Sequence, residues 1–96
     1  MEYEITSRQR RDSYGNLHRF HYDLLVDEVQ VGRFRYEVYG IRIREEDGES
    51  AALSNLSADV REVDRLLTLL AEHAVAPTGL QDVAADWQRE LLPRMA

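Results

Sequence analysis

The chain has 96 residues, the size of one domain, and its 44% hydrophobic content is enough for a core and too high for a disordered chain. It has no cysteine, which excludes disulfide frameworks, thiolate nucleophiles, iron–sulfur clusters and cysteine zinc sites. Its net charge of −6 opposes nonspecific binding to nucleic acid or anionic lipid.

No apolar run approaches the roughly 20 residues that span a bilayer, and Met1-Glu2-Tyr3-Glu4 lacks the basic and apolar regions of a signal peptide. We therefore expect a cytoplasmic protein without a membrane partner. Residues 1–44 carry eight Arg and seven acids, whereas residues 45–96 carry four Arg and eleven acids. Seven of the eight aromatic residues precede residue 40, so we expect the two halves to form different kinds of structure.

The first half has the period-two pattern of β-strands. A first strand is predicted over residues 2–9, with Tyr3, Ile5 and Ser7 on one face. Residues 12–16 contain Gly and Asn and are typical of a turn. A second strand follows, and its apolar face is predicted to consist of Phe20, Tyr22, Leu24 and Val26.

A third strand is predicted over residues 31–44, joined to the second by a loop of residues 28–30. A slip by two places would bring Asp23 opposite Glu37, and facing like charges are destabilising. We therefore predict a register without this clash. Its cross-strand pairs are Leu24 with Phe34, Tyr22 with Tyr36, Phe20 with Val38, Asp23 with Arg35, and His21 with Glu37.

The third strand changes phase near its middle. Its apolar positions are even-numbered up to Val38 and odd-numbered at Ile41 and Ile43. A β-bulge near Tyr39-Gly40 would return both sets to the same face. We interpret Gly40 as a residue that curves the sheet; a bulge that aims a side chain at a site is the alternative.

The second half changes to a helical period. A charged turn over residues 45–49 precedes a short fourth strand at a sheet edge, near Ala51 and Leu53. Ser57 is the predicted N-cap of a first helix, which ends near Ala74 because Pro77 prevents continuation.

A second helix is predicted from Thr78, whose spacing to Gln81 is that of a capping box, and Pro93 is expected to end it. The short loop between the helices predicts an antiparallel helical hairpin. The expected fold is thus a single α+β domain, residues 1–96. A four-stranded antiparallel meander (residues 1–56) is followed by a helical hairpin (residues 57–96) packed on one sheet face.

Four short stretches resemble a family of small uncharacterised clostridial (Firmicutes) proteins, known as a domain of unknown function. They are His21-Tyr22-Asp23-Leu24-Leu25, Tyr39-Gly40-Ile41-Arg42-Ile43, Leu56-Ser57 and Asp82-Val83-Ala84-Ala85-Asp86-Trp87. The resemblance implies a cytoplasmic bacterial protein without an assigned activity, and it transfers no catalytic residue.

The histidines do not predict a metal site. His18 and His21 are three residues apart on a strand, so they face opposite sides of the sheet. His73 lies on the first helix. Histidine metal sites need three or more convergent ligands, so we predict neither a metal nor a cofactor.

Two surfaces are candidate contact sites. Asp82, Asp86 and Glu90 recur every four residues and form an acidic stripe on the second helix, which is either a solvated face or a docking surface for a basic partner. The second surface is the outer sheet face, where the candidate contacts with phosphate or a partner are Arg8, Arg19, Arg33, Arg35 and Tyr39. Cross-strand ion pairing is the alternative for these Arg residues.

No nucleophile motif, GxxxxGK[ST] loop or GxGxxG fingerprint is present, so we name no catalytic residue. We predict a non-catalytic protein-interaction or regulatory module with an unidentified protein partner. Weak nucleic-acid binding through the Arg-rich face is the alternative, although the acidic balance opposes it, and an enzyme is the least favoured class. A homodimer through a sheet edge is a further expectation, because a four-stranded sheet leaves two edges free.

Overall fold

The computed structural model describes the backbone of residues 1–95 and the surroundings of side chains as far as residue 89. The strands β1 to β4 form one antiparallel sheet in chain order, and a 3-10 turn (η1) joins the two helices. The elements are β1 (Glu2–Arg11), β2 (Leu17–Val31), β3 (Phe34–Glu45), β4 (Ser50–Ser57), α1 (Val60–Glu72), η1 (Pro77–Gly79) and α2 (Leu80–Met95). The predicted α+β fold is confirmed, as is the edge position of β4.

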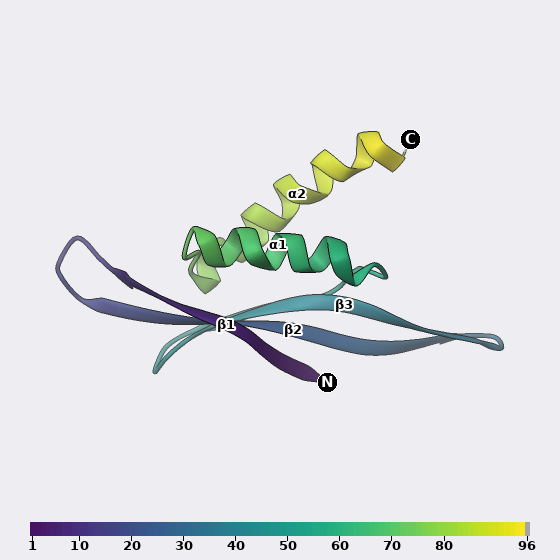
Figure 1. The fold of residues 1–96 in the computed structure, drawn as a ribbon, viewed down its shortest axis with the longest axis horizontal. Helices are drawn as coiled ribbons and strands as arrows, with labels where there is room; N and C mark the ends of the chain where they lie inside the picture. Colours follow the sequence, from purple (N-terminus) through teal and green to yellow (C-terminus); the bar gives the residue numbers. More distant parts are fainter. Residues whose placement is uncertain (96) are drawn as a thin grey trace.

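Both helices lie on the same side of the sheet (Figure 1). α1 lies over the sheet, and α2 runs back in roughly the opposite direction and diverges from α1 toward its C-terminus (Figure 1). The turn between β2 and β3 extends beyond the end of α1, so that no helix covers this end of the sheet (Figure 1). In the part of the chain that the structure describes, neither helix is long and apolar enough to cross a membrane.

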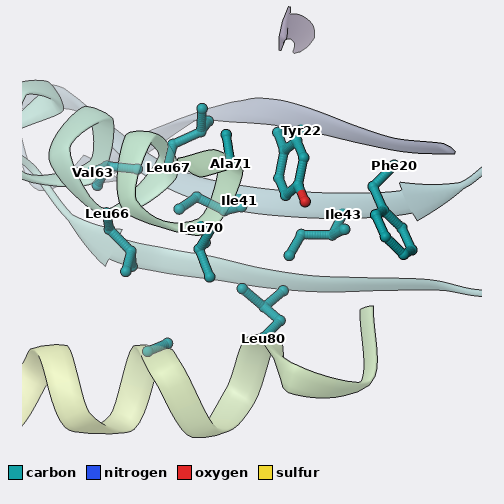
Figure 2. Packing of buried hydrophobic residues seen from close by; sticks show 11 residues of the cluster. Phe20, Tyr22, Ile41, Ile43, Val63, Leu66, Leu67, Leu70, Ala71 and Leu80 are labelled. Carbon is teal, nitrogen blue, oxygen red and sulfur yellow. The ribbon is translucent and has the colours of Figure 1, made fainter. Parts of the chain in front are cut away.

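The core lies between the sheet and α1, and the start of α2 closes one side of it (Figure 2). The Tyr22 hydroxyl donates a hydrogen bond of 3.0 Å to the Val75 carbonyl, and burial raises the pKa of Tyr22 to about 12. This bond ties the centre of the sheet to the segment between the helices. The fully buried apolar side chains of this core are Phe20, Tyr22, Ile41, Ile43, Val63, Leu66, Leu67, Leu70 and Leu80.

A β-bulge interrupts β1. The β1–β2 register shifts by one between Glu4 and Thr6, which leaves Ile5 as the extra residue. Tyr3 therefore lies on the helix side of the sheet, whereas Ser7 lies on the opposite side. The prediction that Tyr3, Ile5 and Ser7 share one face is wrong, because the extra residue reverses the alternation.

The β2–β3 hairpin turns at Gly32 and not at residues 28–30. Val31 pairs with Phe34, and Gly32 has a φ of 60°, as at the first central position of a type II′ turn. From this turn the ladder continues without a shift to the pair of Phe20 with Glu45. The predicted register is wrong because the turn sets the register of a hairpin, whatever charge pairs another register would allow.

The new register moves every predicted partner along β3. Asp23 lies opposite Arg42 and not Arg35, and His21 lies opposite Arg44 and not Glu37. The predicted apolar pairs are replaced in the same way, and the observed pairs are Leu24 with Ile41, Tyr22 with Ile43, and Val29 with Tyr36.

The phase change in β3 has a different cause from the one predicted. The β2–β3 ladder is regular, so Ile41 and Ile43 face the helices while Phe34, Tyr36 and Val38 face the opposite side. The apolar residues therefore change from one face of the sheet to the other along the strand. The expectation that a bulge in β3 returns both sets to one face is wrong.

An irregularity does occur at Gly40, but its extra residues are in β4. The β3–β4 pairing shifts between Tyr39 and Ile41, where β4 steps from Ser57 to Leu53. A Cβ atom at Gly40 would lie 2.2 Å from the Leu53 carbonyl oxygen. Glycine is therefore needed here because the β4 backbone approaches closely, which is one of the established reasons for glycine inside a strand.

The N-terminus of α1 differs from the prediction by two residues. Asp59 is the N-cap, and its side chain accepts a hydrogen bond from the Arg61 backbone N–H. Ser57, the predicted N-cap, accepts from the Asp59 N–H and donates to Glu62 instead. The helix therefore begins two residues later than predicted, because Ser57 is still the last residue of β4.

The start and end of α2 also differ. Thr78 lies inside η1, which is preceded by Ala76 without a side-chain cap, so the predicted capping box is wrong. Pro77 instead begins the helical segment, a position where its missing N–H is harmless. α2 continues past Pro93 to Met95. The predicted end is therefore wrong by two residues. The helix still ends within one turn of Pro93, which removes a backbone donor and crowds the carbonyl of the preceding turn.

Candidate functional site

The sheet face turned away from the helices, here called the outer face, carries two groups of side chains. Odd-numbered residues of β2 and their partners in β3 point to this face. Charged side chains occupy its middle, and apolar side chains occupy its extension toward the β2–β3 turn.

Asp23 is the centre of the charged group and is only 1% exposed. Arg44 Nε lies 2.5 Å from Asp23 Oδ2, and Arg44 Nη2 lies 3.1 Å from both Asp23 Oδ1 and Glu4 Oε1. The hydrogen bond to Asp23 raises the pKa of Arg44. A carboxylate at this depth must be paired and hydrogen-bonded, and Arg44 supplies both, so the loss of Arg44 would leave an uncompensated buried charge.

Arg42, Glu2 and His21 extend the charged group. Arg42 Nε lies 3.0 Å from Glu2 Oε1, and His21 Nδ1 lies 2.6 Å from Glu4 Oε1. Neither contact has the angles of a hydrogen bond. Four members of the group line an open hollow of about 320 Å³: Glu2, Glu4, Asp23 and Arg44. The charges of the group pair across the strands through Arg42 and Arg44. Cross-strand ion pairing was the alternative for other Arg residues, of which Arg35 Nη1 lies 3.7 Å from Glu28 Oε1 and Arg19 Nε lies 3.8 Å from Glu46 Oε2.

The apolar group lies on the end of the β2–β3 hairpin, residues 27–38, here called the ribbon. Phe34 is 77% exposed, Val31 57% and Tyr36 44%. They point to the same face as Val29, which is partly buried. These four residues, Val29, Val31, Phe34 and Tyr36, are called the ribbon face.

In the ribbon, the outer face is apolar and the side toward the helices is polar, whereas in the rest of the sheet the apolar side faces the helices. Its side toward the helices carries Glu28, Gln30, Arg35 and Glu37, all exposed. At its base, Leu25 and Val38 lie on the outer face and are each 9% exposed. The ribbon face therefore continues a buried apolar strip outward, on a side where the described chain supplies no helix (Figure 1).

The ribbon also has free edges. The pairing of β1 with β2 reaches Met1 opposite Val26, and the pairing of β4 with β3 begins at Tyr39. Within the described part of the chain, the strands of the ribbon are therefore hydrogen-bonded only to each other. An isolated two-stranded ribbon is marginally stable in water, so contact with another surface would stabilise it.

The structure does not bring the predicted Arg residues together. Arg19 lies on the outer face, Arg8 and Arg35 lie on the helix side, and Arg33 lies in the β2–β3 turn. Tyr39 packs against the core. The prediction of one shared face is wrong because the β1 bulge and the hairpin register reverse the direction of two of the four. Contact of any one of these residues with a partner stays a prediction.

The acidic stripe on α2 is exposed where the structure describes it. Asp82 and Asp86 are both exposed, and Arg89 Nη2 lies 2.9 Å from Asp86 Oδ1. The surroundings of the Glu90 side chain lie outside the described residues. The docking role of the stripe stays a prediction, and one of its charges is already balanced within α2.

The histidines face opposite sides of the sheet, as expected. His18 Nε2 lies 2.8 Å from Asp12 Oδ2, and His18 Nδ1 contacts Glu45. The hydrogen bond to Asp12, followed by that to Glu45, raises the pKa of His18, and the same imidazole lowers the pKa of Asp12 to about 2. His18 thus connects the β1–β2 turn to the end of β3. Among the described residues, no group of three acids and histidines is arranged to hold a metal ion.

Sequence reasoning missed the ribbon face and the Asp23–Arg44 pair. Both follow from one signal, the dipeptide Gly32-Arg33 between Val31 and Phe34. A glycine followed by any residue between two apolar strand residues is typical of a two-residue II′ hairpin. This turn would have given the pairing of Val31 with Phe34, whereas the exposure of Phe34 depends on which face of the sheet the helices cover.

Comparison with known proteins gives one match. A family model described as a family of unknown function (DUF6514) matches residues 1–90. No curated protein and no solved structure matches the chain. The expected resemblance to a domain of unknown function is confirmed, while the clostridial origin stays a prediction.

Proposed function

This chain belongs to the DUF6514 family, a family of unknown function, and from this premise we propose that it is a non-catalytic protein-interaction module that binds through the ribbon face. The exposure of Phe34, Val31 and Tyr36 on one side of a projecting ribbon carries the proposal. Grouped exposed apolar side chains on a monomer are a mark of interaction sites, whereas single ones are common everywhere.

Two further properties of the ribbon support a binding role. Aromatic side chains supply much of the contact area in protein interfaces and lose little conformational freedom on binding, and the ribbon face contains Phe34 and Tyr36. The polar opposite side of the ribbon, with Glu28 and Glu37, keeps that side in water. A partner would therefore approach from the outer face. We further propose that the module acts in the cytoplasm of a bacterium.

Photo-crosslinking in the cells that make the protein tests this proposal. A photoreactive phenylalanine analogue is placed at Phe34 in the full chain, and the cells are irradiated and separated into soluble and membrane fractions. We expect a discrete protein adduct in the soluble fraction, resistant to nuclease. The adduct should disappear when Tyr36→Arg is added, because a charge at the centre of an apolar contact is expensive to desolvate.

The matched control is the same analogue at Tyr14, which is 90% exposed in the turn at the other end of the sheet. Equal adducts from the two positions, or none from Phe34, would reject the ribbon face as a binding site. A nuclease-sensitive adduct would instead favour the nucleic-acid alternative.

A further inference from the structure

We infer that the ribbon face binds a second copy of this chain, with the two ribbons antiparallel and related by a two-fold axis. The inference rests on the proposed function, since it names the partner for the same surface. It requires that the face be complementary to itself, because in a two-fold contact each residue i that meets j is matched by j meeting i.

The charges at the two ends of the ribbon meet this requirement. Arg33 lies at the tip, in the two-residue turn, and Asp27 lies at the base on the outer face, opposite Val38. Both are exposed, and within the described part of the chain neither forms an ion pair. The ribbon face lies between them. When two such ribbons pack face to face and antiparallel, Arg33 of each copy lies over Asp27 of the other.

The parallel arrangement is disfavoured by the same charges. It would place the two Arg33 side chains together at the tips and the two Asp27 side chains together at the bases. Facing like charges oppose association, whereas the antiparallel arrangement makes two attractive pairs. The charge pattern therefore selects one of the two face-to-face arrangements.

The overall charge of −6 does not prevent this contact, because the ribbon itself is nearly balanced. Residues 27–38 contain two Arg and three acids, a local charge of −1, while most of the negative charge lies in residues 45–96. At 0.15 M salt, charges more than about 8 Å apart are largely screened. Acidic residues of the second half that lie farther than this from the ribbon therefore contribute little to the contact.

The exposed area predicts a weak dimer. Aromatic side chains bury about 150–250 Å² each, so the exposed fractions of Phe34 (77%) and Tyr36 (44%) correspond to roughly 200–300 Å² per copy. With the valines, the two-copy interface stays below the ~1,200 Å² of a stable standard interface. We therefore expect a dissociation constant on the order of 100 μM.

Sedimentation equilibrium of the full chain, from roughly 10 μM to 1 mM, tests the inference. Wild type should convert from monomer to dimer over this range. Phe34→Ser should remain monomeric, whereas the matched Tyr14→Ser at the opposite hairpin should dimerise like wild type. A wild type that stays monomeric at every concentration overturns the inference, and so does a dimer that persists in Phe34→Ser, since that dimer would form through a surface other than the ribbon face.

A charge exchange tests the antiparallel arrangement. Arg33→Asp and Asp27→Arg should each weaken the dimer about tenfold, because each replaces two attractive pairs with two repulsive ones. An equimolar mixture of the two variants restores both attractive pairs in a heterodimer, so its affinity should return to within about threefold of wild type. A mixture as weak as the separate variants overturns the arrangement.

Failure of this inference and failure of the proposed function give different results. If wild type is monomeric but the analogue at Phe34 crosslinks to another protein, the second copy is rejected and the binding role of the ribbon face stands. If the chain is monomeric and Phe34 crosslinks to nothing, both are rejected. An adduct of twice the chain mass supports both.

Discussion

At the residue scale, a few charged side chains hold the ends and the middle of the sheet together. Asp23 is buried on the outer face of the sheet, and Arg44 satisfies its carboxylate there. His18 has a more exposed position, where its two ring nitrogens contact Asp12 and Glu45. Because an imidazole titrates near neutral pH, this second cluster makes stability depend on pH.

Asp12 is the largest cause of the raised pKa of His18 in the folded protein. The stabilisation from charged His18 is therefore complete below the pKa of about 6.5 that histidine has in the unfolded chain. It is lost as the pH rises through the raised pKa of the folded protein. The pKa of Asp12 is lowered to about 2, so its share is present above 3.8 and lost as pH falls toward 2. Thermal melts of wild type and His18→Gln should therefore differ most between about pH 4 and pH 6.5, and the difference should shrink at higher pH.

The control repeats the His18→Gln comparison with Asp12→Asn and Glu45→Gln in both chains. Asn still accepts the turn hydrogen bonds of Asp12 from Tyr14 and Asn16, but both negative charges are gone. In this background the pH dependence should vanish. A difference between wild type and His18→Gln that grows above pH 7 would contradict the assignment.

At the scale of the elements, the C-terminal end of α1 contains a residue in a strained backbone conformation. After the C-cap His73, Ala74 has a φ of 47°, and the N–H groups of Ala74 and Val75 donate to the carbonyls of Ala71 and Leu70 at 3.1 and 3.0 Å. This is the Schellman arrangement, whose left-handed position is usually glycine. Alanine there places a Cβ in a conformation that L residues rarely adopt.

We expect Ala74→Gly to raise the free energy of unfolding by roughly 0.5–1 kcal/mol, because relief of the left-handed strain exceeds the added chain entropy of glycine. Urea unfolding measures this change. The matched control is Arg65→Gly, at an exposed position inside α1, which should lower stability by about 0.7–1 kcal/mol. The same sign for both variants would rule out the assigned role of Ala74.

At the scale of the whole molecule, the sheet has two environments. Under α1 its apolar residues face the helices, and in the ribbon they face the other way, with the change between Val38 and Tyr39 in β3. Phe20 and Phe34 represent the two environments: one is 1% exposed in the core and the other is 77% exposed. Their contributions to stability should therefore differ, although both lie in the same sheet.

Phe20→Ala should lower the free energy of unfolding by about 3–5 kcal/mol, as expected for a buried aromatic residue in a packed core. Phe34→Ala should change it by less than about 0.5 kcal/mol in dilute, monomeric samples. Urea unfolding of both variants, at the same low concentration, makes the comparison. Equal losses would show that the ribbon face is part of the core of the monomer.

The sequence by itself determined the order and type of the elements and the residues that build the core from β2 and α1. These features depend on local periodicity: Phe20 and Tyr22 alternate with polar residues, and Val63, Leu67 and Leu70 repeat at helical spacing. The charged turn before β4 was equally readable, because turn residues act through their own backbone preferences. The sequence did not determine which residue caps α1, because Ser57 and Asp59 are both good N-cap residues. The hydrogen bonds in the folded chain select Asp59.

The tertiary structure decided which face of the sheet the helices cover, and therefore which residues of the ribbon are exposed. A different turn moved the register by seven positions, from Leu24 opposite Phe34 to Leu24 opposite Ile41. It moved Phe34 from the predicted core to an exposed surface. Period-two patterns show that residues share a face, but not which face the helices cover, because that depends on strand pairing and on bulges such as the one at Ile5. The candidate binding site exists because the helices cover the opposite face of the sheet and leave the ribbon face exposed.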